Sequence, residues 1–209
     1  MMKVLAKIIS KKTNLLSVLL ASLLLTTPAI GDYYRIDTLG GHASVNFKIK
    51  HLGYSWLTGR FDKFAGTFEY NEKAPEKSII RITVKTKSLD SNHALRDIHL
   101  RGKKFLNVKK YPEARFVSNS FMPINTKTAR LTGKLSLHGV TRDINTTITR
   151  IGGGKDPWGG YRQGFETHFS IKLGDYGIKH SLGAASEELQ LSIYIEGVKE
   201  SLEDGESKK

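Results

Sequence analysis

Residues 44–52, SVNFKIKHL, alternate between apolar and polar side chains along most of their length. Because successive side chains of a strand point to opposite faces of a sheet, this pattern predicts a half-buried strand. Its inward face would carry Val45, Phe47, Ile49 and His51. A turn over Gly53–Gly59 and a second strand over residues 60–70 complete a predicted hairpin.

The alternation returns six more times along the chain. The runs cover residues 78–88, 114–121, 129–137, 143–151, 164–173 and 188–198, and predicted loops such as GGGKDPWGG at 152–160 separate them. About eight strands at near-regular spacing favour a closed antiparallel barrel or a sandwich over any helical fold. A barrel of about eight strands has room inside only for side chains or one slender ligand. An apolar lumen is therefore the first candidate site.

Residues 92–112, NHALRDIHLRGKKFLNVKKYP, interrupt this pattern. Apolar residues recur there at spacings near a helical period, namely Leu95, Ile98, Leu100, Phe105 and Leu106. Asp90 or Asn92 would cap a helix that begins near residue 92, and Pro112 ends the segment. The sequence predicts a short helical insert near residues 92–107 that closes one end of the barrel.

The insert also gathers Arg96, Asp97, His99 and Arg101 within six positions. One interpretation is structural: residues one apart do not share a helix face, so each charge pairs with a neighbouring strand end. The other is functional: the arginines, with the lysines at 103 and 104, bind an anionic head group at the barrel mouth, because guanidinium suits phosphate geometry. His51 and His99 would face the same mouth. Both interpretations stay open.

Motifs for catalysis or metal binding are absent from the sequence. The chain has no cysteine, and its seven histidines form no i, i+4 pair and no HExxH. Neither GxSxG nor a phosphate-binding GxxxxGK[ST] occurs. We therefore expect no metal, no cofactor and no catalytic residue. The alternative is an enzyme acting on a lipid or amide at the mouth, with His99 and either Asp97 or His51 as acid and base.

The N-terminus predicts an export signal. Lysines precede an uncharged apolar run at residues 15–27, and Pro28, Ala29 and Gly31 follow it. This order is typical of a signal peptide over residues 1–31, cleaved between Gly31 and Asp32. A membrane-spanning helix would need roughly 20 apolar residues, and this run is shorter.

Cleavage would leave one basic domain at residues 32–200 and a polar tail at 201–209. Loss of the leader's four lysines lowers the formal net charge from +13 to +9. A basic protein suits nucleic acid, anionic membranes or acidic ligands. Export argues against nucleic acid and leaves membrane surfaces and phosphorylated lipids as partners.

Several segments resemble, in their order along the chain, the YceI-like family. They are HASVNFKIKHLGYSWLTGRF, GTFEY, LDSNHALRDIHLRGKKFLNVKKYPEARF, LTGKLSLHGVT, DPWGGYRQGFE and EELQLSIYIEG, and the similarity runs from about Tyr34 to Lys199. The succession of HLGYSW, RDxHLR and KYP is the most specific part. One departure is Lys134, where relatives often carry an acid.

The resemblance implies an all-β fold, an elongated lipocalin-like barrel of eight antiparallel strands. It further implies a periplasmic homodimer whose lumen holds a polyisoprenoid, a binding protein for transport, storage or stress protection rather than an enzyme. Together with the inward-facing positions of the alternating strands, the resemblance implies a set of ligand-binding residues. They are Val45, Phe47, Ile49, Ile82, Val84, Phe116, Leu135 and Phe165. The expected gate or head-group residues are His51, Arg96, His99 and Arg101. A module that contacts anionic membrane transiently through its basic surface is the remaining alternative.

Overall fold

A computed structural model describes residues 31–180 and 183–200, so most of the predicted signal peptide and all of the predicted tail lie outside the described residues. The strands are β1 (Asp32–Ile36), β2 (Ser44–His51), β3 (Ser55–Phe61), β4 (Phe64–Tyr70), β5 (Ile79–Lys85), β6 (Leu89–Asp90), β7 (Glu113–Pro123), β8 (Thr128–Leu137), β9 (Val140–Lys155), β10 (Tyr161–Lys172) and β11 (Glu188–Lys199). The helix is α1 (Ala94–Arg101), and short 3-10 turns lie at η1 (Pro75–Lys77), η2 (Thr86–Ser88), η3 (Leu173–Tyr176) and η4 (Ala184–Ser186). Within these ranges, no helix has the length and apolar character needed to cross a membrane.

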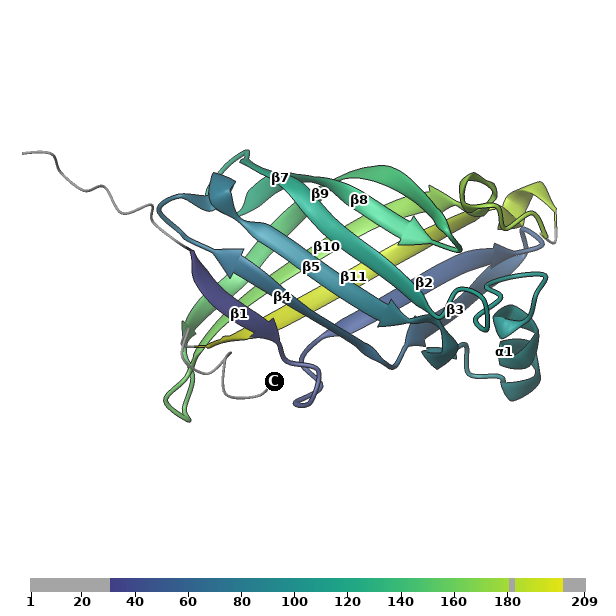
Figure 1. The fold of residues 1–209 in the computed structure, drawn as a ribbon, viewed down its shortest axis with the longest axis horizontal. Coiled ribbons are helices and arrows are strands. Elements are labelled where there is room, and N and C mark those ends of the chain that lie inside the picture. Colours follow the sequence, from purple (N-terminus) through teal and green to yellow (C-terminus); the bar gives the residue numbers. More distant parts are fainter. Residues whose placement is uncertain (1–30, 181–182, 201–209) are drawn as a thin grey trace, which may run out of the picture.

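The strands close into an antiparallel barrel (Figure 1). The ring runs β1, β4, β5, β7, β8, β9, β10 and β11, and β1 pairs back onto β11. Closure removes the open edges that a flat sheet would expose. The predicted eight-stranded antiparallel barrel is confirmed, and the sandwich alternative is wrong.

Three strand positions of the barrel are each built from two segments. β1 and β2 share the first position, because both pair with β11: β1 with its C-terminal end and β2 with residues 189–194. β3 and β4 share the second position, and β5 and β6 share the third, because β6 pairs with β3 while β5 pairs with β4. The eleven segments therefore fill eight strand positions.

Two predicted turns are shorter than the sequence suggested. β3 already begins at Ser55, and Gly59 lies opposite Phe47 in the β2 and β3 ladder. A Cβ atom at Gly59 would lie 2.3 Å from Phe47 Cζ, so this glycine marks a close approach and not a turn. The glycines at 152–154 likewise extend β9 and leave a shorter loop before β10.

The helical insert is present, with a different cap from the two predicted. His93 Nδ1 accepts a hydrogen bond from the Arg96 amide at 3.2 Å. Asn92 has a left-handed φ of 60°, whereas a capping residue has extended backbone. Asp90 accepts a hydrogen bond from the Asn92 amide at 2.8 Å and so shapes the turn before the helix. α1 lies at one end of the barrel, and β1 lies toward the other (Figure 1).

The buried core forms two clusters inside the barrel. One is rich in aromatic side chains and includes Tyr34, Phe68, Tyr70, Phe121 and Phe165. The other includes Phe47, Leu89 and Leu191, and the insert after α1 packs against it. The first cluster belongs to the β1 end of the barrel and the second to the α1 end.

Candidate functional site

An apolar cavity occupies the barrel lumen. It encloses about 1050 Å³, counting its opening to solvent. Among the predicted ligand-binding residues, those that line it are Val45, Ile82, Val84, Phe116, Leu135 and Phe165. These residues come from β2, β5, β7, β8 and β10, so the lumen exists because the barrel closes.

β11 contributes lumen residues that the sequence-based prediction missed. Leu189, Leu191, Ile193 and Ile195 all line the cavity. A signal for them was present, because these four positions alternate with the polar or exposed residues Gln190, Ser192 and Tyr194. The alternation identified the strand, and its apolar positions indicate which side chains face inward.

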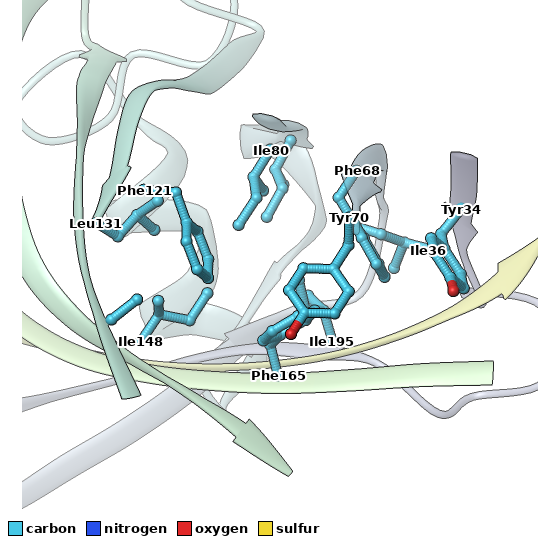
Figure 2. Packing of buried hydrophobic residues seen from close by; sticks show 12 residues of the cluster. Tyr34, Ile36, Phe68, Tyr70, Ile80, Phe121, Leu131, Ile148, Phe165 and Ile195 are labelled. Atoms are coloured by element: carbon cyan, nitrogen blue, oxygen red, sulfur yellow. The ribbon is translucent and has the colours of Figure 1, made fainter. Parts of the chain in front are cut away.

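Aromatic rings close the lumen near β1 (Figure 2). Phe165 packs edge-on against Tyr70, with ring centroids 5.1 Å apart, and against Phe68 at 5.5 Å. Tyr34 stacks on Phe68 at 4.8 Å. Burial raises the pKa of Tyr34 to about 12, so its hydroxyl is neutral. Phe165 borders the cavity while the rings of Tyr34, Phe68 and Tyr70 lie beyond it, and the lumen ends at Phe165.

Two hydroxyl side chains border the lumen, and both are already hydrogen-bonded. Thr146 Oγ1 and Thr167 Oγ1 lie 3.0 Å apart. Thr167 also donates to the Thr147 carbonyl at 2.9 Å, and Thr146 donates to the His168 carbonyl at 3.2 Å. A ligand that passes them meets no unsatisfied hydroxyl, which suits a hydrocarbon chain.

A wider cavity, the mouth, opens at the α1 end of the barrel. It measures about 1820 Å³ including open solvent. The mouth shares lining residues with the lumen, namely Phe61, Leu106, Leu173 and Leu189. Phe47 and Ile49, predicted to line the lumen, line the mouth instead. They face inward as expected, but they lie closer to the hairpin between β2 and β3.

The insert after α1 reaches the junction of mouth and lumen. Phe105 and Leu106 of the insert, together with Leu100 of α1, pack against the core cluster that contains Phe47. Phe105 meets the His180 ring edge-on, with centroids 4.8 Å apart, so the insert also contacts the connection between β10 and β11. Leu106 borders both cavities.

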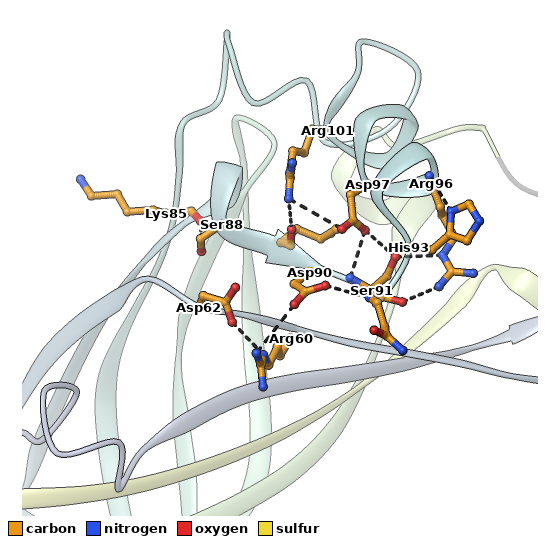
Figure 3. Close-up of polar contacts among 12 residues, drawn as sticks. Arg60, Asp62, Lys85, Ser88, Asp90, Ser91, His93, Arg96, Asp97 and Arg101 are labelled. Carbon is orange, nitrogen blue, oxygen red and sulfur yellow. Dashed lines mark hydrogen bonds and ion pairs between the residues drawn. The ribbon is translucent and has the colours of Figure 1, made fainter.

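Charged side chains of α1 attach the helix to the end of β6 (Figure 3). Asp97 accepts hydrogen bonds from the Ser91 hydroxyl and, at 3.0 Å, from the Ser91 amide. Arg96 Nε donates to Ser91 Oγ at 2.8 Å. Arg101 donates to the Leu89 carbonyl and lies 3.8 Å from Asp97. These contacts agree with the structural interpretation of the charged cluster.

The mouth is lined by basic and histidine side chains. Of the expected gate residues, His51, Arg96 and His99 border it, and Arg101 does not. The other basic or imidazole groups that border it are Lys50, Lys103, Lys104 and His180. No Asp or Glu among the described residues borders the mouth. Its electrostatic potential is therefore positive, and it attracts anions.

A known domain combines this barrel with these sequence segments. The sequence model of the YceI-like domain matches residues 34–197. The chain belongs to the YceI-like family. Protein YceI of Salmonella arizonae is 49% identical over 190 residues, which cover 90% of this chain and 99% of the relative.

Solved structures of similar shape include another YceI protein. The Campylobacter jejuni YceI protein superposes with a TM-score of 0.67 at 28% identity, over 74% of this chain and 91% of that one. A polyisoprenoid binding domain from Saccharophagus degradans superposes with a TM-score of 0.63 at 15% identity, over 81% of this chain and 99% of that one. This second likeness concerns the fold alone.

The predicted acid and base pair is not assembled in this YceI-like barrel. The hydrogen bonds that Asp97 accepts come from Ser91, and none joins it to His99 in the part of the chain that the structure describes. His99 and His51 both border the mouth, but no hydrogen bond among the described residues connects them to each other or to a carboxylate. The enzymatic alternative gains no support from this geometry.

A second charged cluster lies away from the mouth. Arg162 pairs with Asp37 at 2.7 Å and with Glu196 at 2.5 Å, and His42 Nδ1 lies 2.9 Å from Asp37. Hydrogen bonds from His42 and Arg162 hold the pKa of Asp37 well below its usual range. The spacing of Asp37, His42 and Glu196 would suit a metal ion, but Arg162 already neutralises both carboxylates. The cluster fixes the connection between β1 and β2.

Proposed function

We propose that this protein is a periplasmic lipid-binding protein that holds one long apolar lipid of the isoprenoid class. The chain of the lipid would fill the lumen, and its head group would lie in the mouth. The observation that carries the proposal is an apolar lumen that ends at Phe165 and opens toward the α1 end. The name of the similar Saccharophagus degradans domain, a polyisoprenoid binding domain, supports the ligand class.

Apolar burial alone is sufficient for tight binding. A lipid of about 30 carbons, at roughly 0.3 kcal/mol per heavy atom, gains about 9 kcal/mol, which corresponds to sub-micromolar affinity. A partly exposed ion pair contributes about 1 kcal/mol or less. The lumen therefore sets the affinity, and the mouth sets the orientation of the lipid and its selectivity for head groups.

The mouth favours a lipid with an anionic head group. Arg96, Lys103 and Lys104 border it. Lys103 and Lys104 are exposed, so they bind a phosphate without the cost of removing buried charges from water. The protein would act as a carrier or reservoir of such a lipid, in routine transport, in storage or in response to stress.

Native mass spectrometry of protein purified from its own cells tests the proposed ligand. We expect a complex with one lipid per chain, and solvent extraction should release a long-chain molecule. The delipidated protein should then bind a prenyl phosphate more tightly than the corresponding neutral prenyl alcohol. An empty lumen with no affinity for prenyl chains would overturn the proposal.

Export and assembly complete the proposal. The apolar run at residues 15–27 supports cleavage before Asp32, and the family resemblance supports the periplasm and a homodimer. Cell fractionation with N-terminal sequencing should find the processed chain in the periplasm. Light scattering should give twice the mass of one processed chain. An unprocessed cytoplasmic chain or a monomer would overturn the corresponding part.

A further inference from the structure

Large apolar side chains face solvent around the mouth. Tyr54, in the turn between β2 and β3, is 87% exposed. Leu52 and Trp56, on either side of it, and Leu95 and Ile98, on α1, are about half exposed or more. We call these five residues the rim surface. Exposed apolar side chains that gather at one end of a protein suit an interaction site.

The residues of the rim surface lie on two elements beside the mouth, the hairpin between β2 and β3 and the helix α1. Ile98 of α1 borders the mouth, and so do Lys50 and His51 at the end of β2. Trp56 lies opposite Lys50 in the β2 and β3 ladder. The hairpin between β2 and β3 and the helix α1 both lie at this end of the barrel (Figure 1).

Lysines accompany the apolar residues of the rim. Lys48 Nζ lies 4.6 Å from the centroid of the Trp56 ring, and Lys50 Nζ lies 5.8 Å from it. Lys103 and Lys104 border the mouth beside α1. Tyrosine and tryptophan side chains prefer the boundary between lipid tails and head groups, and lysines beside them bind anionic head groups. The rim therefore complements an anionic bilayer in both polarity and charge.

The other exposed tryptophan has different surroundings. Trp158, in the loop between β9 and β10, is 77% exposed. Arg162 lies over its ring at 5.4 Å, and Asp37, Asp156 and Glu196 all pair with Arg162. The basic charge beside Trp158 is neutralised within the protein, whereas the lysines beside Trp56 form no ion pair among the described residues. Trp158 is therefore a matched internal control for Trp56.

We propose that the rim surface docks the barrel, mouth first, on an anionic lipid bilayer. Tyr54 and Trp56 enter the head-group layer, and Lys48, Lys50, Lys103 and Lys104 bind lipid phosphates. Docking places the mouth against the bilayer, so a lipid passes between membrane and lumen without exposing its chain to water. This inference rests on the proposed lipid-binding function and adds the membrane surface from which the ligand comes.

The two tryptophans of the chain allow a direct test. Trp158→Phe leaves Trp56 as the only tryptophan, and Trp56→Phe leaves Trp158, so excitation at a wavelength that tyrosine does not absorb reports on one site in each variant. Each variant is mixed with phosphatidylcholine vesicles, with or without phosphatidylglycerol and brominated lipid. With phosphatidylglycerol present, Trp56 emission should shift to the blue and be quenched, and high salt should reverse both effects. Trp158 emission should stay unchanged.

Vesicle flotation tests the residues themselves. Lys103→Glu with Lys104→Glu should weaken binding to phosphatidylglycerol vesicles about tenfold or more, and Tyr54→Ser should weaken it in the same direction. Trp158→Ser should bind as the unmodified protein does. Equal binding to neutral and anionic vesicles, or equal quenching of Trp56 and Trp158, would overturn the inference.

Two further measurements distinguish bilayer docking from self-association and from lipid binding in the lumen. If the rim joins two copies of the chain instead, Trp56 emission will shift with protein concentration in the absence of vesicles, which would overturn docking. Leu135→Trp, which narrows the lumen, should bind prenyl chains about tenfold more weakly and still float with anionic vesicles. Loss of docking in Tyr54→Ser with prenyl binding intact confirms the rim, because Tyr54 lines neither cavity, whereas absence of prenyl binding in the unmodified protein counts against the proposed function.

Discussion

The carboxylate of Asp97 accepts a hydrogen bond from the Ser91 backbone amide at 3.0 Å and a second from the Ser91 hydroxyl. This pair joins α1 to the end of β6, and Leu106 of the insert that follows α1 borders both the mouth and the lumen. Among the charged residues that resemble an active site in the sequence, Asp97 thus serves to attach α1, and the insert that follows it, to the barrel.

Asp97→Ala should loosen this attachment. Asp97 is 5% exposed, and its loss leaves the Ser91 amide without an acceptor, which costs about 1–3 kcal/mol of unfolding free energy. Urea unfolding measures the loss, and hydrogen exchange over residues 94–101 should become faster. Asp143→Ala removes an exposed carboxylate and should change stability by less than about 0.5 kcal/mol. Equal stability of the two variants would contradict the role of Asp97.

Leu135→Trp should weaken lipid binding. Leu135 borders the lumen, and the larger ring would displace about five lipid carbons, which at roughly 0.3 kcal/mol each gives about a tenfold loss of affinity. Titration of delipidated protein with a prenyl ligand measures it. Lys134→Trp places the same ring on the outer face of β8 and should leave affinity unchanged. A lumen ligand is ruled out if both variants bind equally well.

Phe165→Ala should destabilise the fold strongly. Phe165 is 2% exposed and packs against Phe68 and Tyr70, so truncation costs about 3–5 kcal/mol. Chemical unfolding gives the value. The same change deepens the lumen, so the ratio of affinities for longer and shorter prenyl chains should rise. Val117→Ala, on the exposed face of β7, is the control and should be nearly neutral.

Asp37→Asn should change how stability depends on pH. Hydrogen bonds from His42 and Arg162 depress the pKa of Asp37. A carboxyl with a depressed pKa in the folded state stabilises the fold above its unfolded pKa of about 4, and this contribution is lost as pH falls below that value. The variant should therefore be less stable at neutral pH, and the difference should shrink in acid.

Urea unfolding at neutral pH and below about pH 4 measures that difference. Asp62→Asn affects an exposed pair with Arg60 and serves as the control, with little change at either pH. A destabilisation by Asp37→Asn that stays constant across this range would show that the charge of Asp37 is not its cause.

Gly59→Ala should disturb the mouth. The added Cβ would lie 2.3 Å from Phe47 Cζ and 2.7 Å from the Asp90 carbonyl oxygen, so the Phe47 ring or the backbone must move. We expect a loss of about 1–3 kcal/mol in thermal or urea unfolding. Gly154→Ala meets no atom within 4 Å and should be tolerated. Equal effects of the two changes would contradict the close contact at Gly59.

Alternation along the chain was enough to predict most strands, the barrel and the inward orientation of its apolar residues. The physical reason is local: a strand repeats every two residues, and a half-buried strand shows that repeat in its own sequence. The helical insert was visible for the same reason, because its apolar spacing departs from that repeat. Gly59 misled the prediction, since a glycine in a strand and one in a turn look alike in a sequence.

Only the tertiary structure decides how deep each side chain lies in the barrel and which residues pair across a long stretch of sequence. Phe47 and Val45 share one face of β2, yet Phe47 lines the mouth and Val45 lines the lumen, because depth depends on how each strand is shifted against its neighbours. The ion pair of Arg162 with Asp37 joins residues 125 positions apart. Neither relationship leaves a repeat in the sequence, since both depend on pairing between strands that are far apart in the chain, β2 with β11 in the first case and β1 with β11 in the second.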